Sequence, residues 1–184
     1  VLPEVTLRVG EWADLPPASI RPRVWDAIAA MADRMAGWVE AEFRVDTEED
    51  LDAYTYAVAG AVGVLLSDLW AWYDGTQTDR VEATAFGRGL QAVNILRNRD
   101  EDLAEGVDFF PDGASVDRMQ AYARRQLEVA DRYTDSLPPG PIREFCVLPL
   151  ALAHATLTAL EEGREKLTRA EVIAVVQQAL AGAT

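Results

Sequence analysis

Residues 86–106 read FGRGLQAVNILRNRDEDLAEG, and this stretch decides the fold class. Its apolar residues recur at helical rather than alternating spacing, which predicts a long α-helix that ends near Gly106. Its polar residues follow the same period, at spacings of three, four and four residues. Because side chains at these spacings share one face of a helix, we expect a single polar stripe made of Gln91, Asn94, Asn98 and Asp102. We expect this stripe to face inward, toward an apolar cavity.

The oxygen atoms of this stripe are of the kind that Mg²⁺ prefers, and protein-bound Mg²⁺ commonly bridges substrate phosphates. Asp102 and its neighbour Glu101 offer carboxylates, and Asn98 offers an amide oxygen. Arg97 and Arg99 can pair with diphosphate oxygens. The competing interpretation of the run RNRDED, taken alone, is the solvated face of a surface helix.

Helical periodicity dominates the rest of the chain as well. Thr47 with Asp50, and Thr168 with Glu171, have the spacing of capping boxes, and the segment LPPGP interrupts the pattern. No convincing alternating pattern indicates a strand. The sequence therefore predicts an all-α, single-domain helical bundle over residues 1–184, with helices at about Ile20–Val39, Thr47–Trp72, Thr78–Ala104, Val116–Tyr133, Ile142–Glu162 and from Thr168 onwards.

Composition excludes several classes of function. The net charge of -14 argues against nucleic acid, which requires a clustered cationic surface. An acidic protein can bind a diphosphate only with a cation between them, although acidic charge also simply maintains solubility. Cys146 and His154 are the only residues of their kinds, so an internal disulfide, a thiolate zinc site and a Ser-His-Asp mechanism are all poor interpretations.

The expected location is the cytoplasm. A single cysteine fits a reducing compartment. No signal or transit segment is visible. The longest apolar runs, VAGAVGVLL and CVLPLALA, are shorter than the roughly 20 residues that span a bilayer.

Three segments, in the same order, resemble the squalene/phytoene synthase family. LQAVNILRNRDEDLAEGVDFFP resembles its second aspartate-rich signature, roughly LQ-x-x-NILRD-x-x-ED followed by G-R-x-Y-x-P. DLDAYTYAVAGAVG resembles its Y-C-x-x-VAG-x-VG helix. FCVLPLALAHATL resembles the FC-x-x-P-x-x-x-A-x-ATL helix of the squalene synthase branch. With the looser matches MADRMAGW and KLTRAEV, the resemblance covers roughly residues 15 to 180.

The resemblance implies a bundle of the isoprenoid synthase type and a head-to-head condensation of two prenyl diphosphates that requires Mg²⁺. Farnesyl diphosphate is the implied substrate, with presqualene diphosphate and then squalene as products. The squalene branch uses NADPH as reductant. A hydrophobic product implies peripheral contact with a membrane, and the expected assembly is a monomer or a homodimer.

The same resemblance assigns roles to residues. Tyr54 corresponds to a tyrosine that handles ionisation near the departing diphosphate, and Asp102 is the second catalytic residue. The implied metal ligands are Asn98, Glu101 and Asp102. The implied substrate-binding residues form three sets. A tunnel for the hydrocarbon tails is lined by Val58, Ala59, Val62 and Gly63. The diphosphate is faced by Gln91, Asn94 and Arg97, and the reductive step takes place near Phe145, Cys146 and Pro149.

The residues themselves add two considerations. A carbocation requires a dry aromatic pocket, for which Tyr54 and Phe109 are candidates, whereas Phe86 and Phe110 are expected in the core. Gly60 and Gly63 either make room for isoprenoid chains or permit close helix packing, and the sequence leaves both interpretations open.

The chain departs from the family pattern in several places. Asn98 replaces an aspartate, and Val107 and Phe109 replace an arginine and a tyrosine. The first aspartate-rich motif, D-x-x-x-D, is absent, so an N-terminal part is expected to be missing, with a break in the chain between about Thr6 and Ala13. Two alternative functions follow: a single-substrate diphosphatase or terpene cyclase, and a non-catalytic relative.

Overall fold

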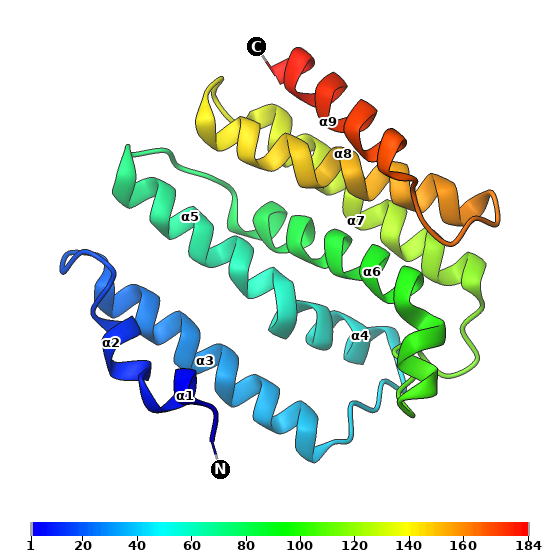
Figure 1. Ribbon diagram of the computed structural model, residues 1–184, viewed down its shortest axis with the longest axis horizontal. Helices are drawn as coiled ribbons and strands as arrows, with labels where there is room; N and C mark the ends of the chain where they lie inside the picture. The colour runs from blue at the N-terminus through cyan, green and yellow to red at the C-terminus, as the bar shows by residue number, and fades with distance from the viewer. Residues whose placement is uncertain (1, 184) are drawn as a thin grey trace.

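The computed structural model describes residues 2–183, and every regular element in that range is helical (Figure 1). A π-helical turn, η1, joins α4 to α5. The all-α fold class is therefore confirmed. The elements in chain order are α1 Glu4–Leu7, α2 Val9–Ala13, α3 Arg21–Glu40, α4 Glu48–Thr55, η1 Tyr56–Gly60, α5 Ala61–Tyr73, α6 Arg80–Ala104, α7 Val116–Ser136, α8 Pro141–Glu161 and α9 Arg169–Ala183.

The helix boundaries follow the capping signals in the sequence. The hydroxyl of Thr47 accepts a hydrogen bond from the amide of Asp50 at 3.1 Å, and the Asp50 carboxylate accepts one from the amide of Thr47 at 2.9 Å. Glu171 accepts the corresponding bond from the amide of Thr168 at 2.7 Å. All the predicted helices form, with boundaries that differ from the prediction by about three residues at most.

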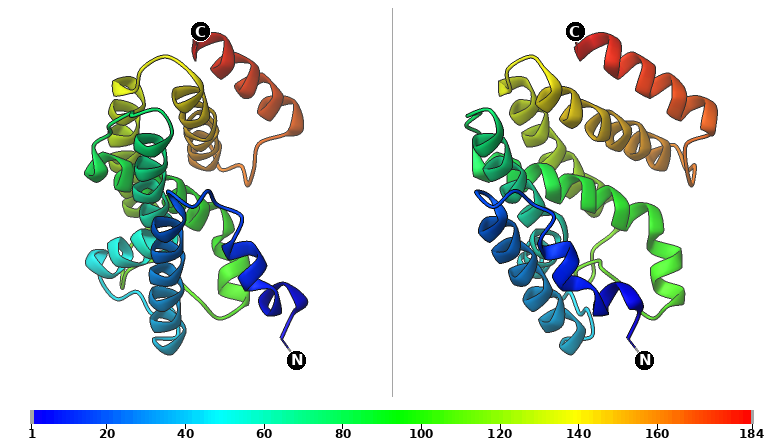
Figure 2. Two further views of the ribbon diagram at one scale, coloured as in Figure 1. Left: turned by 90° about the vertical axis from the view of Figure 1, so that its left-hand side faces the viewer. Right: turned by 60° about the vertical axis from the view of Figure 1, so that its left-hand side comes forward.

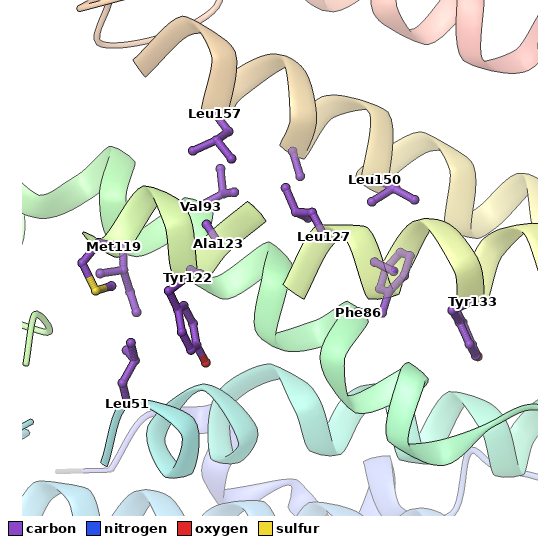
Figure 3. Close-up of a cluster of buried hydrophobic side chains, with 14 of the residues drawn as sticks. Leu51, Phe86, Val93, Met119, Tyr122, Ala123, Leu127, Tyr133, Leu150 and Leu157 are labelled. Carbon is purple, nitrogen blue, oxygen red and sulfur yellow. The ribbon is translucent and has the colours of Figure 1, made fainter. Parts of the chain in front are cut away.

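Helix α6 occupies the centre of the molecule. It packs against α4, η1 and α5 on one side and against α7 and α8 on the other (Figures 1 and 2). Figure 3 shows the hydrophobic cluster that joins α4, α6, α7 and α8, to which α6 contributes Phe86 and Val93. The face of α6 that carries the predicted polar stripe lies outside this cluster.

The helical segment from α4 to α5 is interrupted by the π turn at Tyr56–Gly60. A π turn accommodates one additional residue within a helix, and such turns are frequent at functional sites. Next to it, the backbones of α5 and α6 touch, because a Cβ atom on Gly63 would clash with the carbonyl group of Ala83. Gly87 of α6 approaches η1 equally closely. A Cβ atom on Gly60 would lie 3.0 Å from Cγ2 of Thr84 on α6. Gly60 and Gly63 therefore serve close helix packing, one of the two interpretations that the sequence left open for them.

The backbone is continuous through the N-terminal helices. The amide of Arg8 donates to the carbonyl of Glu4 at 3.1 Å, and the amide of Glu11 donates to the carbonyl of Arg8 at 2.9 Å. Hydrogen-bonded helix therefore occupies the segment from Thr6 to Ala13, and the expectation that an N-terminal part is missing stays a prediction. Helices α1 and α2, which bury no residue, were not predicted from the sequence.

The bundle has an open surface. Its accessible area is 10918 Å², whereas a compact monomer of 20.2 kDa exposes about 8,800 Å². Exposed apolar side chains occur on α3, α5 and α8, among them Ile28, Val62 and Phe145. By length and composition alone, the helices Glu48–Tyr73 and Pro141–Glu161 are suited to cross a membrane. The apolar runs in the sequence indicate segments too short to span a bilayer, so the two results differ. Buried core helices of soluble proteins also have this length and composition.

Candidate functional site

The polar stripe on α6 forms as predicted, but it does not face an enclosed apolar cavity. The side-chain amide of Asn98 donates to Oδ1 of Asn94 at 3.1 Å, and Nε of Arg97 donates to Oδ1 of Asn98 at 3.0 Å. Asn94 and Arg97 are exposed, whereas Gln91, Asn98 and Asp102 are half-buried. The inward orientation was predicted wrongly, because the opposite face of α6 fills the core, while Asn94, Arg97 and Asn98 hydrogen-bond one another at the surface.

A polar cavity of about 520 Å³ lies between the C-terminal half of α6 and the connection from α8 to α9. Arg97 and Lys166 line it, and within residues 2–183 neither side chain forms an ion pair. The terminal nitrogen atoms of Arg97 are therefore available to an anion. The cavity also carries carboxylates, so a strongly charged anion bound here requires a metal cation as well. The other lining residues are Asn98, Asp100, Glu101 and Glu165.

An apolar groove of about 220 Å³ adjoins this cavity between α6 and α8. Arg97 lines both the cavity and the groove. Asn94 and Pro149 lie in the groove too, so three of the predicted substrate-binding residues meet here. The remaining walls are mostly hydrocarbon, with Leu90, Val93, Leu152, Ala153 and Thr156.

Tyr54 lies in a cluster of aromatic rings rather than beside an open pocket. Its ring stacks on Phe109 at a centroid distance of 4.4 Å, and the edges of Trp38 and Phe43 complete the cluster at 5.3 and 6.4 Å. Burial, together with the charge of Asp102, raises the pKa of Tyr54 to about 12. None of the cavities described in residues 2–183 is lined by Tyr54. The expected pocket is thus filled by the rings themselves, and Phe86 and Phe110 are core residues as predicted.

Asp102 lies in a strongly acidic environment one turn beyond Asn98. Burial raises the pKa of its carboxyl group above the ordinary value, and the charges of Glu105, Glu101 and Asp108 raise it further. In the part of the chain that the structure describes, no three Asp, Glu, His or Cys side chains are placed to hold a metal ion. Mg²⁺ commonly binds only one or two carboxylates, and substrate phosphates and waters supply its other ligands. Asp102 is therefore suited to be one of the carboxylate ligands.

Arg99 is already occupied by the protein. It forms an ion pair with Asp108 at 3.0 Å, and its guanidinium lies 3.8 Å from the centroid of Phe110. The expectation that Arg97 and Arg99 both reach a diphosphate is therefore wrong for Arg99, because successive residues of a helix point about 100° apart and these two differ by two steps.

Comparison with known proteins identifies the family. The sequence profile described as squalene/phytoene synthase matches residues 18–113, or 96 of the 184 residues. The chain belongs to this family. It is 29% identical over 160 residues to squalene synthase of Mus musculus and 30% identical over 158 residues to squalene synthase of Schizosaccharomyces pombe.

A solved structure has the same fold as this squalene/phytoene synthase chain. The structure described as the complex of TcSQS with the ligand BPH1237 aligns with a TM-score of 0.79 at 22% sequence identity. The alignment covers 91% of this chain and 58% of that chain. The sequence matches cover 73% and 72% of this chain but only 38% of the mouse protein and 33% of the fission-yeast protein. The matched part of the chain therefore spans only about a third of the length of these two curated relatives.

The squalene-branch motif on α8 divides between surface, groove and core. Phe145 is exposed and its edge meets Trp70 at 6.4 Å. Cys146 is buried, and burial raises the pKa of its thiol to about 12. Pro149 lies inside α8, where it cannot donate the usual hydrogen bond to the carbonyl of Phe145. Of these three residues, only Pro149 lines a described cavity.

The residues predicted to line a hydrocarbon tunnel lie on η1 and α5. Val58 is half-buried against the core, and Val62 is exposed. The carbonyl of Ala59 lies against Gly87, and Gly63 lies against the backbone of Ala83. None of the four lines a described cavity of residues 2–183, so their contact with a substrate stays a prediction.

Lys166 and Glu165 belong to the polar cavity, although the sequence did not predict them as site residues. Their connection lies about 65 residues beyond the stripe, and no local periodicity relates the two. One signal was present, because Lys166 is the only lysine in a chain whose other cations are arginines.

Proposed function

We propose that this chain is part of an Mg²⁺-dependent prenyltransferase that joins two prenyl diphosphates head to head. The proposed substrate is farnesyl diphosphate, with presqualene diphosphate or squalene as product. The observation that carries the proposal is the position of Arg97, which lines both the polar cavity and the apolar groove. A prenyl diphosphate has the same two parts, a charged head and a hydrocarbon tail, so its head is assigned to the cavity and its tail to the groove.

Magnesium is proposed to be held by Asp102 and Asn98, with Glu101 as a third ligand. When bound, Mg²⁺ would neutralise the negative charge that develops on the leaving diphosphate. The raised pKa of Asp102 supports this assignment, because a cation there offsets the repulsion from Glu101 and Glu105. Arg97 and Lys166 hold the diphosphate by charge-assisted hydrogen bonds.

Tyr54 is proposed as the second catalytic residue. Its pKa, raised to about 12, keeps the hydroxyl protonated at neutral pH, so that it can donate to a departing oxygen. Contact with substrate requires the stacked ring of Phe109 to shift. NADPH is proposed as the reductant of a second step, by similarity to the squalene branch alone.

A single-substrate reaction is the second candidate. Asn98 supplies no charge where the family pattern has an aspartate, and Val107 supplies none where it has an arginine. A weaker metal site suits the ionisation of one prenyl diphosphate, followed by capture of water or by cyclisation. The product is then farnesol or a cyclic terpene.

The proposed setting is the cytoplasm, with peripheral contact to a membrane that takes up the hydrophobic product. The helices Glu48–Tyr73 and Pro141–Glu161 are apolar enough to support such contact. The proposed assembly is a monomer or a homodimer, and no nucleic acid is a partner, given the net charge of -14.

The test is product analysis. Purified protein is incubated with farnesyl diphosphate and Mg²⁺, with and without NADPH, and organic extracts are separated by gas chromatography. Squalene, or presqualene alcohol after phosphatase treatment, supports the condensation. Farnesol or a cyclic terpene supports the second candidate.

Absence of turnover together with absence of binding of a non-hydrolysable farnesyl thiodiphosphate overturns both. If the protein binds the thiodiphosphate analogue but turns over no substrate, the remaining interpretation is that the chain is a non-catalytic relative.

A further inference from the structure

Helix α4, which carries Tyr54, is only eight residues long. So short a helix is not stable on its own and depends on the elements that pack against it. The π turn that follows does not continue the winding of an α-helix, so α5 does not dictate how α4 is turned about its axis. The rotation of α4 is therefore set by the side chains that hold its faces, and the aromatic cluster around Tyr54 holds only one of them.

Tyr122 of α7 holds a different face of α4. Figure 3 shows its ring extending from α7 toward α4. The hydroxyl of Tyr122 donates to Oδ1 of Asp52 at 2.7 Å and lies 3.3 Å from Oγ1 of Thr55. Because successive residues of a helix point about 100° apart, Asp52 lies about 160° and Thr55 about 100° around α4 from Tyr54. Tyr122 thus restrains a side of the helix that Tyr54 does not occupy.

This restraint has a rigid base. Tyr122 is 2% exposed and belongs to the hydrophobic core, so its ring cannot follow a rotation of α4. The second oxygen of Asp52 pairs with Arg88 of α6 at 3.6 Å, so α6 and α7 hold this carboxylate together. Glu48 of α4 also pairs with Arg125 of α7, but water screens that exposed pair. The Tyr122 hydroxyl is therefore the main polar restraint on this side of α4.

We infer that Tyr122 is a positioning residue for Tyr54. The inference rests on the proposed function, in which the hydroxyl of Tyr54 donates to the departing oxygen. Loss of the Tyr122 hydroxyl leaves α4 held on the aromatic side alone, and a turn of the helix displaces the Tyr54 hydroxyl. A displacement of about 1 Å of a reacting group lowers a rate by up to about a hundredfold.

The test measures steady-state release of pyrophosphate from farnesyl diphosphate with Mg²⁺, which reports both candidate reactions. Tyr122→Phe should lower kcat by roughly tenfold and change KM by less than about threefold, because it misplaces a reacting group without removing a substrate contact. The matched control is Tyr133→Phe, which should leave both constants unchanged. It removes the same hydroxyl from an equally buried tyrosine of α7, whose ring lies against Trp70 and Phe86 instead.

Equal effects of the two tyrosine variants, or a change in KM alone, overturn the inference. Two substitutions of Asp52 test the same hydrogen bond from the side of α4. Asp52→Asn keeps an oxygen that can accept from Tyr122 and should retain most of kcat, whereas Asp52→Ala should match Tyr122→Phe. If the two Asp52 variants lower kcat equally, the hydrogen bond does not position Tyr54 and the inference fails.

A double-mutant cycle on stability tests the same restraint without turnover. Independent residues have effects on the unfolding equilibrium constant that multiply to within about twofold. If Tyr122 sets the rotation of α4, the combined effect of Tyr122→Phe and Phe109→Ala should differ from the product of the single effects by more than about threefold. The reason is that the first change already disturbs the stack that the second removes, and multiplicative effects overturn the inference. If the unaltered protein releases no pyrophosphate, the proposed function fails instead, and the cycle still decides whether Tyr122 holds α4.

Discussion

Tyr54 of α4 and Phe109, which follows α6, stack nearly parallel with ring centroids 4.4 Å apart and an interplanar angle of 16°. The stack joins the helix that leads into the π turn to the loop after the acidic end of α6. It fixes the tyrosine proposed for catalysis, and several of its consequences can be measured.

Removal of the stacked ring should loosen this junction. Phe109→Ala is expected to lower the free energy of unfolding by about 2 kcal/mol, less than for a fully buried phenylalanine because Phe109 is half-buried. Urea denaturation followed by circular dichroism measures the change. The matched control is Phe145→Ala, whose 54% exposed ring should change stability by less than about 0.5 kcal/mol. Equal effects of the two variants would show that the stack contributes nothing specific.

Alkaline pH should destabilise the fold through its buried acids. Burial raises the pKa of Cys146 to about 12 from 9.0, and burial with Asp102 raises that of Tyr54 to about 12 from 10.0. Between the unfolded and folded values, the unfolded chain has released a proton that the folded chain retains. Stability is therefore fully present below about pH 9 and should fall by about 1.4 kcal/mol per pH unit per group as pH rises toward 12.

Urea titrations at intervals from pH 8 to 11 check this direction. Cys146→Ala removes one of the groups, so its stability should fall less steeply above pH 9 than that of the unaltered protein. An unchanged slope would contradict the assignment of the thiol.

Asp102 should oppose stability and support binding. Its raised pKa means that the folded state disfavours the ionised carboxylate near Glu101 and Glu105. Asp102→Asn is therefore expected to raise the free energy of unfolding at pH 7, by no more than about 0.5 kcal/mol because water screens this partly exposed group. Mg²⁺ with pyrophosphate should raise the Tm of the unaltered protein more than that of the variant. A variant with lower stability and an undiminished Mg²⁺ response would remove Asp102 from the site.

Substitutions of Arg97 and Arg99 should have different effects, the first on ligand binding and the second on the free energy of unfolding. Arg97→Gln is expected to weaken Mg²⁺-pyrophosphate binding by roughly tenfold, because charge-assisted hydrogen bonds are lost, with stability changed by less than about 0.5 kcal/mol. Arg99→Gln loses the ion pair with Asp108 and the contact with Phe110, and should cost about 1–2 kcal/mol of stability. Calorimetric titration and urea denaturation of both variants give the comparison. The opposite pattern would place the anion at Arg99.

Two glycines offer a matched test of helix packing. Gly63→Ala should destabilise by about 2 kcal/mol or more, because its Cβ meets the backbone of Ala83, which cannot move aside cheaply. On α3, a Cβ atom at Gly37 would have no neighbour within 4 Å, so Gly37→Ala should stabilise by up to about 1 kcal/mol. Thermal unfolding of both proteins distinguishes them, and a neutral Gly63→Ala would indicate that α5 and α6 separate readily.

The parts of the fold that depend on short stretches of sequence were predictable. Capping at Thr47 and Thr168 is decided within four residues, and the stripe on α6 follows from helical period alone. The site depends on longer distances. Nothing local indicated that Lys166 would join Arg97 at one cavity, or that Asp108 would occupy Arg99, since both outcomes depend on how loops return to α6.

The orientation of the stripe was mispredicted for a related reason. Periodicity places Asn94 and Asp102 on one face but does not say which neighbouring helix covers that face. Helix α8 borders the stripe at Asn94 without covering it, so the stripe lies at the edge of the core. The aromatic candidates showed the same limit, because Tyr54 and Phe109 were expected to line a space that they instead fill.

The π turn at Tyr56–Gly60 makes the chain unusually intolerant of changes in length there. One residue of α-helix corresponds to about 100° of rotation. Deleting any one of these five residues would restore ordinary winding and swing everything on α5 about a quarter-turn relative to α4. Tyr54 could then no longer stack on Phe109 while Gly63 packs against α6, so a single deletion here should be more damaging than any substitution at the same positions.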